Sequence, residues 1–553
     1  MEHKIVETDV LCIGGGIAGL MAAIRASDLG AKVVVAEKAN TLRSGDAGMG
    51  NDHFPSYIPE VHGPDVEPFV REMIGSPVFG KLMRSAKFWR TRLKKSFELV
   101  KLWDSWGIPM KYQGKYEFAG HTIPGREAEC TALKYYGQNQ KKILTKKALE
   151  KGIKILNRIM VFDLLRNGSV IGALGINTRE DTMIEFRAKS VILGTGRTMR
   201  LFPGPTPAWM FNVANCPSTT GDGRAMAYRA GAELVNMELL IKWAGPKYFS
   251  RCGKGSWVGV IRDSKGKPAG PFLTKPHRRY GDPIADIYSK IFEDSIKNGK
   301  GPVYMSCKGI SDDDLEYMKL WLTQEGNTAL LNHLKEEKID VTKNDVEFMT
   351  YEVDAWGGIP YNEKGETSLK GLYAAGDEYG DQISAAAIFG WISGENAAKY
   401  AKKKSAAIDN AKLKATVASK SDFLDKIRSR KEGITWQEAN IALQQIMQDY
   451  AGGVKSEDLL KAGLSHLRKL KKKAYENIMA ANQHELMHCL EVLNLYDLGE
   501  LLLQAARERK ETRGNHIRAD YPFTNPLLNK MLICRKKGNN PVFEWREIEE
   551  ERS

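Results

Sequence analysis

The segment Thr8–Lys38, TDVLCIGGGIAGLMAAIRASDLGAKVVVAEK, decides the fold of this chain. An apolar run that can form a buried strand leads into Gly14, Gly16 and Gly19, which have the spacing G-x-G-x-x-G. Apolar residues at helical spacing follow, and a second, β-branched run ends on Glu37. The glycine spacing alone is a weak signal. A strand, the glycines, a helix, a second strand and a terminal acid within about 30 residues predict a dinucleotide-binding unit.

Each residue type in this unit has a mechanical role. Gly14 permits the tight turn, Gly16 lets the backbone approach a pyrophosphate, and Gly19 lets the helix pack closely on the strand. The helix N-terminus directs free N–H groups at the pyrophosphate. Glu37 can accept a hydrogen bond from a ribose 2′-hydroxyl, which favours an adenosine ribose without a 2′-phosphate.

The composition is that of a globular protein with a basic surface. The 553 residues are 42% hydrophobic and 27% charged, with a net charge of +14, and a chain of this length holds about two to four domains. Such a charge can attract nucleic acid, an anionic substrate or an acidic protein, or be spread over solvated faces. No nucleic-acid-binding module is legible, so we expect no nucleic-acid partner.

Cysteines and apolar runs argue against three classes of protein. The seven cysteines are scattered without a C-x-x-C pair, which argues against a disulfide framework and against an iron–sulfur cluster held by this chain. No run of about 20 apolar residues lacks a charge or a glycine turn, so we expect no transmembrane segment. Because the dinucleotide unit begins almost at Met1, we expect no signal peptide and a cytoplasmic location.

Loops, helices and strands alternate after the first unit. Thr41–Asn51, TLRSGDAGMGN, is predicted to be a loop whose backbone passes close to a flat ligand. Residues 65–106 carry tryptophans and lysines at helical spacing, which predicts amphipathic helices. A helix and four strands are then expected over Ile143–Asp163, Ser169–Ile176, Ile184–Arg187 and Ser190–Thr195.

Five later motifs show a specific resemblance. One strand ends in Gly194-Thr195-Gly196, and Thr220–Ala232 reads T-G-D-G-x-x-M-A-x-R-A-G-A. Gly357-Gly358-Ile359 and the segment Gly371–Asp377, GLYAAGD, follow, and Arg509–Pro522 reads RKETRGNHIRADYP. Together with the N-terminal unit, these motifs resemble the fumarate reductase/succinate dehydrogenase flavoprotein superfamily over nearly the whole chain.

The resemblance implies bound FAD and an α/β fold. The expected parts are a discontinuous Rossmann-like FAD-binding domain (residues 1–240 plus 350–402), an inserted α+β capping domain (241–349), a C-terminal helical domain (403–520) and a C-terminal tail (521–553). Asp377 would bind the ribityl chain and Glu37 the adenosine ribose. The expected cofactor contacts are Gly14, Gly16, Gly19, Glu37, Lys38, Ser44, Gly45, Gly50, Gly196, Asp222, Gly376 and Asp377.

The FAD is expected to be non-covalent. Covalent members of the superfamily attach flavin to a histidine directly after the R-S of the glycine-rich loop. Here Arg43-Ser44 is followed by Gly45, and His53 lies eight positions further on. The R-S-G sequence and the region 215–234 resemble the α subunit of adenylylsulfate reductase more than the covalent members.

Three departures from the family argue against fumarate and succinate as substrates. Fumarate reduction needs cations that clamp two carboxylates and a proton source near the flavin. The family's histidine after the T-G-D-G helix is absent from Lys242–Lys247, KWAGPK. Its proton-donating arginine corresponds to Ala285 in the stretch 285–288, and Tyr379–Gly390, YGDQISAAAIFG, lacks its histidine and arginine clamp.

The expected capping domain offers a different set of side chains. Cations interleaved with indoles suit a phosphate- or sulfate-bearing aromatic ligand such as an adenine nucleotide. The same pattern suits a basic docking face or an ordinary solvated hairpin, and we leave these alternatives open. We expect Asn51, Trp243 and Arg262 to be catalytic wall residues. The full set of cations and indoles is Lys242, Trp243, Lys247, Arg251, Lys254, Trp257 and Arg262.

One motif is expected to mislead. His484–His488, HELMH, matches the H-E-x-x-H zinc pattern, but it falls in the expected helical domain and no third ligand follows at a recognised spacing. We therefore expect no metal.

Two functions remain open. The chain can be the catalytic flavin subunit of a reductase acting on an anionic, nucleotide or sulfur substrate, or an electron-transfer module without a small substrate. No second G-x-G-x-x-G unit for a nicotinamide nucleotide is visible. The electrons are therefore expected to pass through a ferredoxin-like iron–sulfur protein subunit, and the charge of +14 favours an acidic partner.

Overall fold

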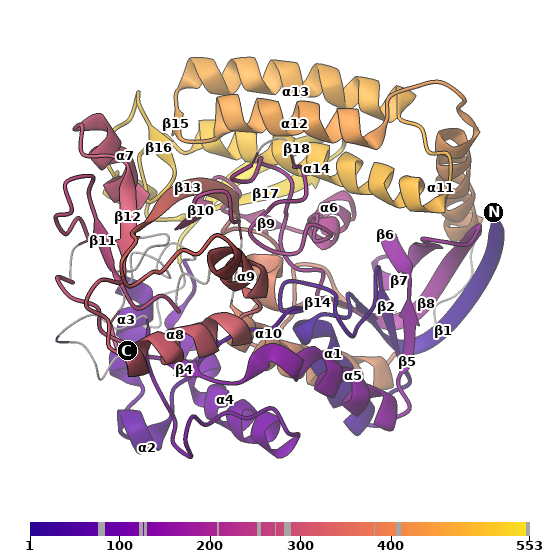
Figure 1. The fold of residues 1–553 in the computed structure, drawn as a ribbon. Coiled ribbons are helices and arrows are strands. Elements are labelled where there is room, and N and C mark those ends of the chain that lie inside the picture. Colours follow the sequence, from indigo (N-terminus) through magenta and orange to yellow (C-terminus); the bar gives the residue numbers. More distant parts are fainter. Residues whose placement is uncertain are drawn as a thin grey trace.

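Figure 1 shows the fold in a computed structural model. Several predictions lie wholly or partly outside the residues that it describes. They include Arg251, Lys254, the stretch 285–288, Asp381 of the clamp segment, and residues 76–82 within the helices expected over 65–106. The described residues are 1–75, 83–120, 125, 130–206, 209–250, 256–270, 273–280, 289–380, 382–404 and 411–548.

The largest sheet contains the dinucleotide unit. Its strands follow the order β5-β2-β1-β8-β7-β6, and β14 also pairs with β8. The pairs β5–β2, β2–β1, β1–β8 and β8–β14 are parallel, whereas β6–β7 and β7–β8 are antiparallel. The strands are β1 (Glu2–Ile13), β2 (Val33–Glu37), β5 (Lys154–Asn157), β6 (Ile159–Asn167), β7 (Ser169–Asn177), β8 (Thr182–Leu193) and β14 (Leu372–Ala374).

Strand β8 corrects the sequence prediction. The sequence predicts separate strands over Ile184–Arg187 and Ser190–Thr195, but the structure has one continuous strand, Thr182–Leu193. Its first half pairs with β7 as the expected hairpin, and its whole length pairs with β1. The parallel neighbour therefore keeps the two apolar runs in one element.

Glycines allow two helices to pack closely over this sheet. Helix α1 (Ile17–Asp28) lies against α10 (Ile383–Lys402). A Cβ at Gly390 would lie 2.5 Å from the carbonyl oxygen of Ala18, and one at Gly394 would lie 2.2 Å from that of Ala22. The remaining helices of this part are α2 (Pro59–His62), α3 (Glu67–Gly75), α4 (Ala86–Ser105), α5 (Gln140–Glu150) and α6 (Asp222–Arg229).

A second sheet forms the centre of the inserted part. Its antiparallel strands have the order β10-β13-β12-β11 and cover a separate core that includes Trp321 and Phe348. The strands are β10 (Leu240–Pro246), β11 (Val260–Arg262), β12 (Val303–Ser306) and β13 (Val346–Ala355). The helices are α7 (Ser289–Lys297), α8 (Asp312–Gln324) and α9 (Thr328–Glu336).

Long helices follow at the C-terminal end of the chain, and α12 and α13 lie over α14 at the top of Figure 1. The expected tail carries a hairpin, β17 (Met531–Lys537) and β18 (Asn540–Arg546), which joins β9 (Leu234–Val235). The helices are α11 (Ala411–Ser429), α12 (Trp436–Ala451), α13 (Glu457–Asn477) and α14 (Gln483–Glu508).

The predicted fold class is confirmed: the structure combines a mainly parallel sheet, an inserted α+β part and a C-terminal helical part. The residue boundaries of the domains stay predictions. Within the described ranges, every helix is too short or too polar to span a bilayer.

Candidate functional site

A pocket opens at the carboxyl ends of three neighbouring strands of the large sheet. Strand β1 ends at Ile13, β2 at Glu37 and β8 at Leu193, and residues directly after each strand line the pocket. Open parallel sheets bind ligands at this position. The loops at 44–51 and 214–219, strand β10 and the start of α10 complete the lining.

The three glycines of the first motif occupy different surroundings. Gly14 has φ +92°, and a Cβ on it would lie 2.4 Å from the oxygen of Gly194. A Cβ on Gly19 would lie 1.8 Å from the oxygen of Gly14, so this position sets the packing of helix on strand. A Cβ on Gly16 would meet only the Gly194 oxygen, at 3.7 Å. Gly16 lines the pocket and caps α1 without a side-chain hydrogen bond, which leaves the helix N-terminus suited to an anion.

The Glu37 carboxylate accepts hydrogen bonds from the backbone on both sides of strand β2's end. Its Oε2 accepts a hydrogen bond from the backbone N–H of Gly15 at 2.7 Å, and its Oε1 accepts one from Ala39 at 2.7 Å. The side chain also lines the pocket. Because each carboxylate oxygen can accept more than one hydrogen bond, Glu37 can still receive a ribose hydroxyl.

Lys38 and Asp222 are bonded to each other at the pocket wall. Lys38 Nζ lies 2.8 Å from Asp222 Oδ2 and 2.7 Å from Glu491 Oε1. Burial opposes the charge of Lys38, but the two carboxylates outweigh it and raise the pKa of the ammonium group. Glu491 in turn accepts from Arg200 at 2.8 Å, and both of these side chains are fully buried. This charge network links the β2 loop to helices α6 and α14.

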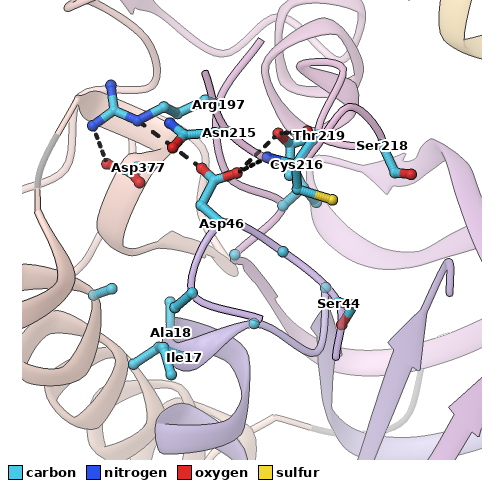
Figure 2. A pocket seen from close by; sticks show the side chains of 18 of the residues that line it. Ile17, Ala18, Ser44, Asp46, Arg197, Asn215, Cys216, Ser218, Thr219 and Asp377 are labelled. Carbon is cyan, nitrogen blue, oxygen red and sulfur yellow. Dashed lines mark hydrogen bonds and ion pairs between the residues drawn. The ribbon is translucent and has the colours of Figure 1, made fainter. Parts of the chain in front are cut away.

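Arg197 lies between two carboxylates (Figure 2). Its Nη2 is 3.1 Å from Asp377 Oδ1, and its Nε is 4.0 Å from Asp46 Oδ2. Asp46 Oδ1 also accepts from the backbone N–H of Cys216 at 3.0 Å and from the hydroxyl of Thr219 at 3.3 Å. Four segments that are distant in sequence are thereby fixed around the middle of the pocket.

Glu378, beside Asp377, is a buried carboxyl group with an altered titration. Its Oε1 accepts from the backbone N–H of Thr195 at 2.6 Å and from the Thr195 hydroxyl at 2.7 Å. Burial raises the pKa of Glu378 to about 7, although the Thr195 hydrogen bonds and the charge of Arg224 act in the opposite direction. This group therefore changes protonation near neutral pH.

The other end of the pocket lies where the large sheet meets the inserted part. Asn51, His53, Trp243, Glu325 and Trp356 line it. Asn51 Oδ1 accepts from the backbone N–H of His53 at 3.1 Å. Indoles from β10 and from the end of β13 thus face the same space as the loop of Asn51. We call this region the capping end and the region around Glu37 and Lys38 the adenosine end.

Most of the expected site residues line this pocket, but four do not. Gly19 packs helix on strand, Gly50 lies against the backbone of Gln324, and Gly376 lies against Ala386. Arg262 donates to the carbonyl oxygens of Gly266 and Thr274, at 3.0 and 3.2 Å, away from Asn51 and Trp243. The predicted residues that line the pocket are Gly14, Gly16, Glu37, Lys38, Ser44, Gly45, Asn51, Gly196, Asp222, Trp243 and Asp377.

The other cations and indoles of the inserted part have separate structural contacts. Lys242 pairs with Glu293 and lies 3.7 Å from Glu352. Lys247 pairs with Glu347 at 2.9 Å, and Trp257 is buried with its ring 5.4 Å from that of Phe348. Within the described residues, this part of the chain therefore supplies Trp243 to the pocket but neither of these lysines.

The H-E-x-x-H motif is part of the buried charge network. His488 Nδ1 lies 2.7 Å from Glu491 Oε2, and its ring stacks on Trp436 with centroids 4.2 Å apart. No group of three or more metal-ligating side chains is found among the described residues.

Sequence reasoning missed several lining residues, above all Asp46, Arg197 and Trp356. Asp46 directly follows the quoted R-S-G sequence, and Arg197 directly follows Gly196. Each lies next to a recognised motif, but its charged partner comes from a distant segment. The charged residue types could have indicated a site at these positions, whereas the pairing between distant segments could not be inferred from the sequence.

A dinucleotide fits the side chains of this pocket. The free helix N-terminus at Gly16 suits the pyrophosphate. Ser44 Oγ is buried at the pocket wall and, within the described part of the protein, has no hydrogen-bond partner. A bound phosphate or flavin oxygen would satisfy it. Glu37 would hold the ribose at one end, and Asp377 with Arg197 would hold the chain toward the flavin.

Comparison with known families agrees with this geometry. The family model described as "FAD binding domain" matches residues 9–387, and the model described as "Fumarate reductase flavoprotein C-term" matches residues 440–552. The first match covers more than half of the chain.

Individual relatives match along almost the full length. A fumarate reductase (CoM/CoB) of Methanothermobacter marburgensis contains a chain that is 24% identical over 572 aligned positions, covering 97% of this chain and 98% of the relative. Adenylylsulfate reductase of Archaeoglobus fulgidus has a TM-score of 0.82 at 22% identity, covering 98% of this chain and 96% of that chain. An E. coli quinol fumarate reductase has a TM-score of 0.84 at 19% identity, covering 98% and 97%.

The predicted superfamily and the predicted FAD are confirmed by these matches. The chain belongs to the fumarate reductase and succinate dehydrogenase flavoprotein family and is an FAD-dependent oxidoreductase.

Proposed function

We propose that this chain is the flavoprotein subunit of an iron–sulfur-linked reductase for a small anionic substrate other than fumarate or succinate. The observation that supports this proposal is the lining of the capping end. Trp243 and Trp356 line it together with Asn51, His53 and Glu325. Among the described residues no lysine or arginine lines this end, and Arg197, nearer the middle of the pocket, is paired with Asp377. A dicarboxylate needs cations at both of its ends, whereas indoles suit an aromatic group such as adenine.

Bound FAD would supply two-electron transfer at its flavin ring. The protein's own residues would position the reactants. The glycine loop and α1 would hold the pyrophosphate, and Arg197 would place a positive charge between Asp46 and Asp377. The indoles of Trp243 and Trp356 would exclude water and orient a planar substrate. We base the functional analogy on the adenylylsulfate reductase α subunit.

The test is a titration of the oxidised holoprotein followed by the flavin absorption spectrum. Adenosine monophosphate, adenylylsulfate and sulfite are the probes, and fumarate and succinate are the comparison ligands. We expect a saturable change with the nucleotide or sulfur ligands, and we expect Trp243→Leu to weaken it at least tenfold. Trp545→Leu, in the C-terminal hairpin, serves as the matched control because Trp545 contacts Arg509 outside the pocket.

The fumarate measurement can contradict the proposed substrate class, since the relative from Methanothermobacter marburgensis is named a fumarate reductase. Fumarate reduction with an artificial electron donor at roughly 1–1000 per second, the usual range for enzymes, would contradict the proposal. If none of the ligands changes the spectrum, the second function, an electron-transfer module between proteins, is favoured by the absence of a carboxylate clamp from the sequence.

The partner we propose is a small acidic iron–sulfur protein of the ferredoxin type. A net charge of +14 would steer such a partner to this chain. Complex formation should therefore weaken as salt rises, because exposed charges are screened over about 8–10 Å at 0.1–0.15 M. Co-purification from the native source at low salt tests this. Rapid turnover of the isolated chain with NADH would contradict it.

A further inference from the structure

His53 belongs to a chain of buried polar groups at the capping end of the pocket. Its Nδ1 lies 2.7 Å from Asp52 Oδ1, and Asp52 is completely buried. Asp52 Oδ2 accepts from Lys134 Nζ at 2.5 Å and from Ser256 Oγ at 2.6 Å. His53 itself lines the pocket, and 17% of its side chain is exposed. The cluster therefore begins in the protein interior and ends at the space that would receive a substrate.

The tautomer of His53 follows from its partner. Burial opposes the ionisation of Asp52, but the charges of Lys134 and His53 outweigh it and lower the pKa of the carboxyl group. An ionised carboxylate can only accept hydrogen bonds, so Nδ1 of His53 must carry the proton that it shares with Asp52. Proton exchange with the pocket then takes place at Nε2. Histidines that act as acids or bases are commonly oriented by a carboxylate in this way.

The buried ion pair between Asp52 and Lys134 is better explained by the position of His53 than by stability. Lys134 is 1% exposed and Asp52 is 0% exposed. A fully buried ion pair is weak evidence for stability, because desolvation offsets much of the attraction. This pair is instead placed to hold His53, since strand β3 (His53–Pro55) pairs with β4 (Ala132–Lys134) and sets His53 opposite Lys134. Ser256, from the inserted part, completes the coordination of Asp52.

We propose that His53 is the catalytic acid and base of this enzyme, with Asp52 and Lys134 as its positioning residues. The proposal rests on the proposed function, a reductase with a small substrate. In the reducing direction the substrate would gain a hydride, that is two electrons and one proton, from reduced FAD and a second proton from His53 Nε2. Solvent then returns a proton to the imidazole. The charged groups of this cluster are Asp52, beside His53, and Lys134 on β4, and Glu325 after α8 lines the same pocket.

The test uses the holoprotein and needs no substrate. Reduction places negative charge on the flavin, so a nearby imidazole should bind a proton when the flavin is reduced. Potentiometric titration of the flavin between pH 5 and 8, the range in which imidazole titrates, gives the number of protons bound per two electrons. We expect wild type to bind about one proton more than His53→Asn in part of this range. Asparagine keeps a donor for Asp52 but cannot titrate.

The control is His466→Asn, which changes an exposed histidine on α13 and should match wild type. If His53→Asn does not retain flavin, His53→Gln replaces it in the same measurement. Identical proton uptake in wild type and in the His53 variant would overturn the proposal. The proposed function fails by a different result, namely that no small anion changes the wild-type flavin spectrum at any pH, and that result does not depend on the His53 variant.

Discussion

The two ends of the pocket are built in different ways. The adenosine end comes mainly from one continuous stretch, in which β1, the glycine loop, α1 and β2 place Gly16 and Glu37. The capping end combines residues from the glycine-rich loop, β10, the segment after α8 and the end of β13. The first end depends on local backbone geometry, and the second depends on how distant segments pack. Substitutions should therefore have sharper and more separable effects at the adenosine end.

The largest effect should come from Gly16→Leu. A Cβ at this position meets only one backbone atom, at 3.7 Å, so the fold can accept the side chain. The side chain would occupy the space of the pyrophosphate, and we expect flavin content to fall to zero. Flavin absorbance measured against protein concentration reports this loss, and circular dichroism checks folding.

Gly75→Leu is the matched control, because nothing lies within 4 Å of a Cβ at the end of α3. It should keep one flavin per chain. A folded Gly16→Leu protein with full flavin content would show that the adenosine end is not where this cofactor binds.

The second test asks whether the loop between the two ends attaches the flavin. Gly45 stands where covalent family members have histidine. Burial and the nearby charge of Asp46 raise the pKa of Cys216, a thiol that also lines the pocket. A protonated thiol is a poor nucleophile. We therefore expect acid precipitation to release all of the flavin into the supernatant, and flavin retained in the pellet would contradict this.

The contrast between the two ends also explains what could be predicted from the sequence. The roles of Gly14, Gly16 and Glu37 follow from spacing within one short unit, and all three line the pocket. Asp46 and Arg197 stand beside recognised motifs, but their pairing brings together loops that are far apart in the chain. Likewise, the cluster of Asp52 and Lys134 exists only because β3 pairs with β4.

Arg262 also shows that the sequence alone does not determine which residues line the pocket. The cations and indoles in this part of the sequence are one ground for expecting Arg262 at the pocket wall, but Arg262 is not among the residues that line the pocket. Strand β11 is an edge strand of the second sheet, paired only with β12 among the described strands, and there Arg262 holds a turn through the carbonyls of Gly266 and Thr274. Alternation in sequence does not determine which face of an edge strand meets a ligand.

The third prediction is a pH effect on stability at Glu378, the buried neighbour of the pocket residue Asp377. The folded-state pKa of Glu378, about 7, lies above its ordinary value of 4.5. Between these values the folded protein holds a proton that the unfolded chain has released, so this group's contribution to stability is lost as pH rises from about 4.5 to 7. The loss amounts to about 3 kcal/mol. Glu378→Gln mimics the protonated group and should remove this dependence.

Urea unfolding of the holoprotein in excess FAD at pH 5 and pH 8 measures the effect. Relative to wild type, Glu378→Gln should gain about 2.5 kcal/mol on going from pH 5 to pH 8, because part of the loss has already occurred at pH 5. Glu316→Gln, which changes an exposed carboxylate on α8, should show almost no such gain. Equal pH dependence in wild type and in Glu378→Gln would show that the buried carboxyl group stays ionised in the folded protein.

The smallest effect should come from Arg262→Gln. This substitution tests whether a residue outside the pocket lining affects ligand binding at the capping end. The guanidinium of Arg262 donates to two carbonyl oxygens of a surface turn, and the residue does not line the pocket. We therefore expect less than about a twofold change in the dissociation constant of an anionic ligand, which corresponds to under about 0.5 kcal/mol. Trp243→Leu should change the same constant at least tenfold, because Trp243 lines the pocket. A tenfold effect of Arg262→Gln would mean that the inserted part moves toward the pocket when a ligand binds and brings β11 to the substrate.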